Sequence, residues 1–183
     1  MKKILALLVA IVSFSCSNAQ KKTFSKEALS ENLVALDGAE IPFKTILEKH
    51  KGRTIVIECW ASWCGDCVKA MPKVKELQEK NPDVVYVFLS CDKTSDKWIE
   101  GIKKHELKGD HFFIKDGMKG SFGKSIDLDW IPRYIIVNEK GEISLYRAIE
   151  TDFDLIQKVL NGENADQKSE GDEIKLSNSP IIK

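Results

Sequence analysis

The sequence predicts an α/β domain in which helices flank a partly parallel β-sheet. Two apolar runs without polar alternation, residues 54–60 and 84–90, have the composition of strands that are covered on both faces. A helical pattern lies between them, and two further strand patterns and a helix follow. With 183 residues, 43% of them hydrophobic, the chain is long enough to bury one core of this kind.

The first elements follow in order along the chain. Residues 33–43 contain Asp37-Gly38, which is typical of the turn in a β-hairpin. Residues 45–50 have room for one or two helical turns before the first apolar run. The apolar stripe of residues 67–80 predicts a helix that ends at Asn81-Pro82.

The second half of the domain adds two helices and two strands. Residues 96–107 have the pattern of an amphipathic helix, and residues 131–137 and 143–147 that of two strands. The four residues 138–141 between these strands have a turn composition. Residues 152–160 predict a closing helix, which a following Asn-Gly pair ends.

Both ends of the chain differ from this domain, which we place at residues 33–162. Residues 1–19 have the basic start, apolar run and small-residue end of a cleavable secretory signal peptide. The apolar run, residues 4–12, is about half of the roughly 20 residues that a membrane-spanning helix needs. We expect residues 20–32 to be a linker and the polar residues 163–183 to be mostly disordered.

Cys16 leaves a second route of export open, because a cysteine just after an export signal can carry a lipid anchor. Against this, Ser13 stands where an aliphatic residue is usual. Both routes take the protein out of the cytoplasm, to the periplasm or cell envelope, and membrane contact is expected only through a lipid or a partner. The 28 basic and 28 acidic side chains balance, which argues against a nucleic-acid partner.

The chemistry concentrates at Cys64 and Cys67, two cysteines separated by two residues where a buried strand turns into a helix. The N–H groups of a helix N-terminus stabilise a thiolate, so Cys64 is the expected nucleophile and Cys67 the expected resolving thiol. Zinc would need a second ligand pair, and haem attachment a histidine directly after Cys67. No metal or other cofactor is expected, and a structural disulfide that never cycles is the remaining alternative.

The sequence resembles the thioredoxin superfamily, most closely the exported thiol-disulfide oxidoreductases of the TlpA/ResA type. Residues 60–67, WASWCGDC, match the active-site signature, Pro72 falls where these proteins kink the active-site helix, and Ile131-Pro132 matches the family's cis-proline. The resemblance implies a thioredoxin-like three-layer sandwich, with a central mixed sheet flanked by helices and an extra N-terminal hairpin. It also implies that the backbone at Ile131 and Pro132 pairs with an extended substrate, and Trp63 is expected to offer that substrate a flat apolar surface.

Glu58 places a carboxyl group inside an otherwise apolar strand. Burial without a charged partner would raise its pKa, so that it could hold or accept a proton near neutral pH. In thioredoxin an acidic residue occupies the matching place, and the resemblance implies that Glu58 is the general base for Cys67. The alternative is an ion pair with Lys73 or Lys75 and no part in the chemistry.

Asp66 departs from thioredoxin, which has proline at this place. A negative charge about 6–7 Å from Cys64, at an intermediate dielectric, costs a thiolate on the order of 1 kcal/mol. The pKa of the Cys64 thiol would rise by less than about one unit. A less stable thiolate favours the disulfide, so Asp66 is expected to make the pair a better reductant.

Several residues around this motif keep open interpretations. Cys59 is expected to be a small buried side chain, and Cys91 either a buried free thiol or a third redox thiol. Arg133 either contacts an acidic partner or is a solvated loop charge, and Trp130 belongs either to the core or to the substrate surface. Two other tryptophans are expected in the core: Trp60 and Trp98.

The leading expectation is an exported enzyme that reduces disulfides of client proteins. Thiolate Cys64 attacks a client disulfide, and Cys67 then releases the reduced client. A membrane-bound thiol-disulfide electron donor is the expected partner that restores the dithiol. Members of this type often keep the cysteines of apocytochrome c reduced, but nothing in the sequence selects that client. A disulfide oxidase or isomerase is one alternative, and a non-catalytic thiol-based copper-binding or adaptor module is another.

Overall fold

The computed structural model describes residues 21–163. The strands are β1 (Asn32–Ala35), β2 (Glu40–Pro42), β3 (Ile55–Trp60), β4 (Val85–Ser90), β5 (Asp110–Phe113), β6 (Arg133–Val137) and β7 (Ile143–Ala148). The helices are α1 (Lys26–Ser30), α2 (Phe43–Lys49), α3 (Gly65–Lys80), α4 (Ser95–His105), α5 (Ser121–Ser125) and α6 (Phe153–Leu160). The predicted signal peptide, Cys16 and the predicted tail beyond Glu163 lie outside the described residues.

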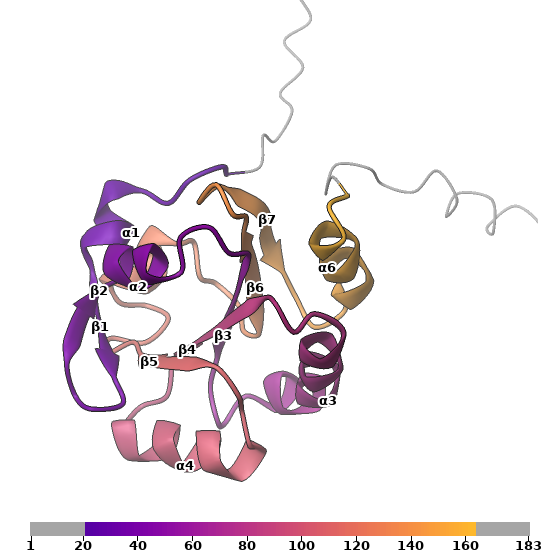
Figure 1. The fold of residues 1–183 in the computed structure, drawn as a ribbon. Helices are drawn as coiled ribbons and strands as arrows, with labels where there is room; N and C mark the ends of the chain where they lie inside the picture. Colours follow the sequence, from indigo (N-terminus) through magenta and orange to yellow (C-terminus); the bar gives the residue numbers. More distant parts are fainter. Residues whose placement is uncertain (1–20, 164–183) are drawn as a thin grey trace, which may run out of the picture.

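All seven strands form one mixed sheet in the order β2-β1-β5-β4-β3-β6-β7. Strands β3, β4 and β5 run parallel, whereas β6, β7 and the β1–β2 hairpin join in antiparallel pairs. Figure 1 shows α3 and α6 on one side of the sheet and α1 and α2 on the other. The predicted three-layer sandwich with an N-terminal hairpin is therefore confirmed.

Contacts that involve an aromatic ring link the helices within each layer. On one side, the Lys73 Nζ atom of α3 lies 5.5 Å from the ring centroid of Phe153 in α6. On the other, the ring of Phe43 in α2 meets that of Phe122 in α5 edge to face, 5.1 Å apart. Buried rings of this kind supply much of the area that holds helices to a sheet.

Strand β3 lies between β4 and β6, and all six of its residues are buried. Glu58 stands opposite Tyr134 of β6, and Cys59 stands opposite Arg133. The strand then leads directly into α3, the first turn of which carries the cysteine pair. The most deeply covered strand of the sheet thus presents Cys64 at its carboxyl end, where α/β folds usually place their ligands.

Helix α3 begins and ends at side-chain caps. Cys64 is the N-cap residue, and its Sγ accepts a hydrogen bond of 3.1 Å from the backbone N–H of Cys67. At the other end the side chain of Asn81 donates to the carbonyl of Leu77 at 2.8 Å. Pro72 lies inside the helix, as the sequence predicts.

Three short elements are absent from the sequence prediction: β5, α1 and α5. Helix α1 falls within residues 20–32, where we expected a linker, and its Ala28 is fully buried. Each of these elements has only four or five residues, too few for a hydrophobic period to emerge. None of the helices within residues 21–163 is long and apolar enough to cross a bilayer.

Candidate active site

Cys64 and Cys67 are joined in a disulfide at the start of α3, with their Cα atoms 5.3 Å apart. Cys67 is fully buried, and Cys64 is 6% exposed. The Cys64 Sγ atom lies 3.5 Å from the carbonyl oxygen of Ile131, and the peptide bond between Ile131 and Pro132 is cis. The fold therefore brings the two sequence motifs together, although they are more than 60 residues apart in the chain.

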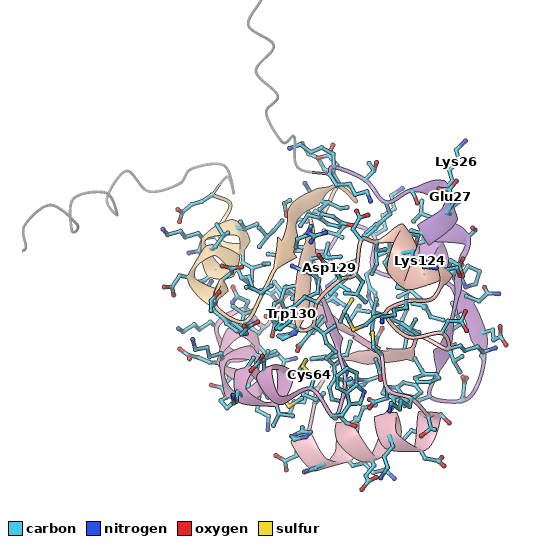
Figure 2. All side chains as sticks on the ribbon, turned by 180° about the vertical axis from the view of Figure 1, so that it is seen from behind. Lys26, Glu27, Cys64, Lys124, Asp129 and Trp130 are labelled. Atoms are coloured by element: carbon cyan, nitrogen blue, oxygen red, sulfur yellow. A yellow bond between two sulfur atoms is a disulfide. The ribbon has the colours of Figure 1, made fainter. Side chains whose placement is uncertain are left out.

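Two exposed tryptophans belong to the segments that carry these motifs. Trp63, directly before Cys64, is 58% exposed, and Trp130, in the loop before Pro132, is 51% exposed. Figure 2 labels Cys64 beside the beginning of α3 and Trp130 on the loop that precedes β6. Exposed large aromatic side chains are unusual on a protein surface and are common where another molecule binds. The two tryptophans predicted in the core, Trp60 and Trp98, are confirmed there.

Glu58 is 3% exposed and keeps its carboxyl group inside the domain. Its Oε1 accepts a hydrogen bond of 3.3 Å from the hydroxyl of Tyr134, and its Oε2 has no hydrogen-bond partner among the described residues. Burial penalises the carboxylate and raises the pKa of Glu58 to about 8, although the Tyr134 hydrogen bond acts in the opposite direction. Glu58 therefore changes its charge close to neutral pH.

Glu58 points toward the face of the sheet that α3 and α6 cover. Its partner Tyr134 packs edge to face on Phe153 of α6, with ring centroids 5.3 Å apart. The alternative in which a lysine neutralises Glu58 is wrong: Lys75 pairs with Glu106 at 3.4 Å, and Lys73 lies over the ring of Phe153.

Asp66 lies in the first turn of α3, between the two cysteines. Its side chain is 43% exposed and stands 3.5 Å from the Nζ atom of Lys69, itself 82% exposed. Water and this lysine screen the carboxylate, so its effect on Cys64 keeps its sign but loses much of its size.

The other two cysteines of the described residues are free and buried. Burial raises the pKa of the Cys91 thiol to about 12, with Asp92 adding to the effect. Burial also raises the pKa of Cys59 well above its ordinary value. Neither side chain supplies a thiolate at neutral pH, so Cys59 is a buried core residue as predicted, and Cys91 is a buried free thiol.

Arg133 contradicts both of our interpretations, because it is neither a solvated charge nor a free contact for a partner. It is 5% exposed, and its guanidinium donates to Asp129 at 2.7 Å and to the carbonyl of Arg147 at 2.5 Å. Arg147 binds the second oxygen of Asp129 at 2.5 Å. The loop before Pro132 is thus held by an ion pair between the buried guanidinium of Arg133 and the exposed carboxylate of Asp129.

Sequence reasoning missed two residues that contact the site. Tyr134 is the partner of Glu58, and Asp92 is a buried carboxylate that binds the backbone and side chain of Ser62. Asp92 follows the carboxyl end of β4, the strand beside β3. Its position after a parallel strand is a signal that could have pointed to the same edge of the sheet as Cys64.

Comparisons with known proteins point to one family. The profile of the thioredoxin-like family matches residues 52–143, half of the chain. The thiol-disulfide oxidoreductase ResA of Bacillus cereus is 26% identical over 147 residues, which cover 76% of this chain and 81% of ResA. A solved structure from Bacteroides vulgatus, described as a thiol-disulfide oxidoreductase, is 31% identical with a TM-score of 0.59, over 74% of this chain and 88% of that one.

A thiol-disulfide oxidoreductase from Bacteroides fragilis has the same fold, with a TM-score of 0.60 at 23% identity, over 71% of this chain and 94% of that one. The family profile covers β3, the cysteine pair, Pro132 and β6, which together build the site. The chain belongs to the thioredoxin-like family and is a thiol-disulfide oxidoreductase.

Proposed function

We propose that this protein is an exported reductase that transfers two electrons from the Cys64/Cys67 dithiol to disulfides of client proteins. The observation that carries the proposal is the disulfide at the start of α3, with one sulfur 3.5 Å from the carbonyl of Ile131 and the other fully buried. One sulfur can meet a client, and the other is kept for the second step.

In the first step the thiolate of Cys64 attacks one sulfur of a client disulfide. A new bond forms between Cys64 and the client, the client disulfide breaks, and its second sulfur leaves as a thiolate that takes up a proton. The N–H of Cys67, which binds Cys64 Sγ at 3.1 Å in the disulfide, is placed to stabilise the attacking thiolate. Cys64 is therefore the nucleophile.

In the second step Cys67 attacks Cys64 Sγ and releases the reduced client. Cys67 is fully buried, so its proton needs an acceptor inside the domain. Glu58 is a buried carboxyl on the sheet face beneath α3, with a pKa of about 8 and a free oxygen atom. Its ionised form takes the proton of Cys67, and its protonated form returns a proton when the disulfide is reduced again.

The client lies across Trp63, Ile131 and Pro132. The exposed indole of Trp63 offers apolar area beside Cys64, and the backbone at Ile131 pairs with an extended client segment. Trp130, two residues before Pro132 and 51% exposed, adds apolar area to this surface. The client class is therefore a polypeptide whose disulfide lies in an extended, solvent-accessible segment.

The cellular setting follows from the first residues and from the redox direction. Residues 1–19 have the pattern of a signal peptide, with lipidation at Cys16 as the alternative route, and both lead to the periplasm or cell envelope. After each turnover the Cys64–Cys67 disulfide needs two electrons from a dithiol protein, for which a membrane-bound donor is the natural partner outside the cytoplasm. Cytochrome c biogenesis is one process that uses such a reductase.

Trapping of mixed disulfides tests the assignment of the two cysteines. Cys67→Ser should accumulate covalent complexes with client proteins, because the attack by Cys64 proceeds and the release fails. Cys64→Ser should accumulate none, and Cys91→Ser, at a buried free thiol, should behave like the parent. Complexes with Cys64→Ser and none with Cys67→Ser would reverse the roles. Their absence from both variants would contradict the proposed activity.

A further inference from the structure

Asp92 is a buried carboxylate at the carboxyl end of β4, and it is 2% exposed. Both of its oxygens accept from the backbone N–H of Ser62 at 3.1 Å. The Ser62 hydroxyl donates to Oδ1 at 2.7 Å, and the Ser90 hydroxyl donates to Oδ2 at 2.8 Å. Burying a carboxylate is costly unless donors of this kind surround it.

The residue that Asp92 holds belongs to the turn that presents Cys64. The backbone N–H of Cys64 donates to the carbonyl of Ala61 at 3.1 Å, which closes a turn over residues 61–64. Ser62 is the second residue of this turn, and Trp63 is the third. The hydrogen bonds from Ser62 to Asp92 therefore also fix the direction that the chain takes from the end of β3 to Trp63 and Cys64.

A second contact confines the same residue from α4. Gly101 of α4 has no side chain, and a Cβ atom placed there would lie 2.8 Å from Cβ of Ser62 and 3.1 Å from the indole of Trp60. The backbone of α4 thus packs directly against Ser62, and Asp92 holds Ser62 by hydrogen bonds. The turn before Cys64 is restrained on two sides.

We infer that Asp92 is a positioning residue, which holds the turn of residues 61–64 so that Cys64 Sγ stays aligned with the first N–H groups of α3. The inference rests on the proposed role of Cys64 as the attacking thiol. Asparagine at position 92 would replace one accepting oxygen by an NH₂ group, which faces hydroxyl and N–H donors instead of accepting from them. The turn would then loosen while the size of the side chain is kept.

The test measures alkylation of Cys64 by iodoacetamide as a function of pH, in the Cys67→Ser background. Asp92→Asn should move the midpoint of alkylation to higher pH and slow the reaction at pH 7 about threefold, the equivalent of about half a unit of pH. Ser62→Ala removes only one of the donors, so it should shift the midpoint in the same direction by less. Asp83→Asn makes the same change at an exposed site before the other end of β4 and should leave the midpoint unchanged.

The direction of the shift separates the possible roles. If Asp92 acted only through its charge, its removal would stabilise the thiolate and lower the midpoint, which would overturn the inference. A lower melting temperature with an unchanged midpoint would do the same, because it would leave Asp92 a role in folding alone. Should Asp92→Asn fail to fold, Ser62→Ala decides by the same criteria. If alkylation in the background variant does not depend on Cys64, the proposed function itself is wrong.

Discussion

The hydroxyl of Tyr134 donates a hydrogen bond of 3.3 Å to Oε1 of Glu58, and it is the one hydrogen-bond donor to this carboxyl among residues 21–163. The Tyr134 side chain is 1% exposed, and its burial, together with the neighbouring carboxyl group of Glu58, raises the pKa of the phenol well above its ordinary value. Tyr134 is therefore a permanent donor. Its hydrogen bond lowers the pKa of Glu58, but burial raises this pKa by more.

Removing the hydroxyl of Tyr134 should change the pH dependence of the second step. Tyr134→Phe removes the hydrogen bond that lowers the pKa of Glu58 and keeps the burial that raises it. The pKa of Glu58 should therefore rise above about 8. Stopped-flow release of a chromophoric thiol from Cys64 by Cys67 should then accelerate at a higher pH than in the parent. An identical pH profile in the two proteins would mean that Tyr134 does not tune the base.

Replacing Glu58 itself should remove the proposed proton acceptor. With Glu58→Gln we expect the release step to slow by about 100-fold or more near pH 8, because a positioned general base contributes about 10²- to 10⁴-fold. The rise of the rate through pH 8 should also disappear. Glu79→Gln makes the same change at an exposed position of α3 and should have no effect. Equal rates for Glu58→Gln and the parent would leave Glu58 a structural role only.

Glu58 also couples stability to pH, with a sign that follows from its raised pKa. The folded protein holds the Glu58 proton up to about pH 8, whereas the unfolded chain releases it near 4.5. The stabilising contribution is complete below pH 4.5 and is lost as the pH rises to 8. Relative to Glu58→Leu, the free energy of unfolding of the parent should fall by on the order of 4 kcal/mol between pH 4.5 and pH 9. Urea unfolding of both oxidised proteins measures this, and a constant difference would contradict the buried, neutral carboxyl.

The charge of Asp66 should make the pair more reducing. Asp66→Asn should raise the reduction potential, but by less than about 30 mV, since 30 mV corresponds to about 1.4 kcal/mol in a two-electron couple. The side chain is 43% exposed and faces Lys69, so high salt should shrink the difference between parent and variant. Equilibration in glutathione buffers measures both. A more negative potential in the variant would refute the electrostatic argument.

The parts of the site that sequence predicts are those encoded in short local patterns. The pair Cys64 and Cys67 lies between a recognisable strand and a recognisable helix, and Glu58 stands out as a charge in an apolar run. Pro132 follows from the resemblance. For each of these the burial or placement in the structure agrees with the expectation.

The remaining parts depend on which strands lie side by side. Tyr134 meets Glu58 only because β6 pairs with β3 in one register, and Asp92 meets Ser62 only because β4 ends beside the turn. Arg133 illustrates the limit, since a charged residue near the start of a predicted strand does not reveal the carboxylate of Asp129 that allows its burial. Strand β5 is likewise held by pairing with β4 and β1, not by its own pattern.

The reduction potential of the Cys64/Cys67 pair tests the central claim most directly. The protein would be equilibrated in thiol buffers and followed by the fluorescence of Trp60 and Trp63, which adjoin the pair in sequence. A reductase predicts a potential near that of thioredoxin, about −270 mV. A value of about −120 to −180 mV would contradict it in favour of an oxidase or isomerase, and a pair that does not cycle would contradict the enzyme itself.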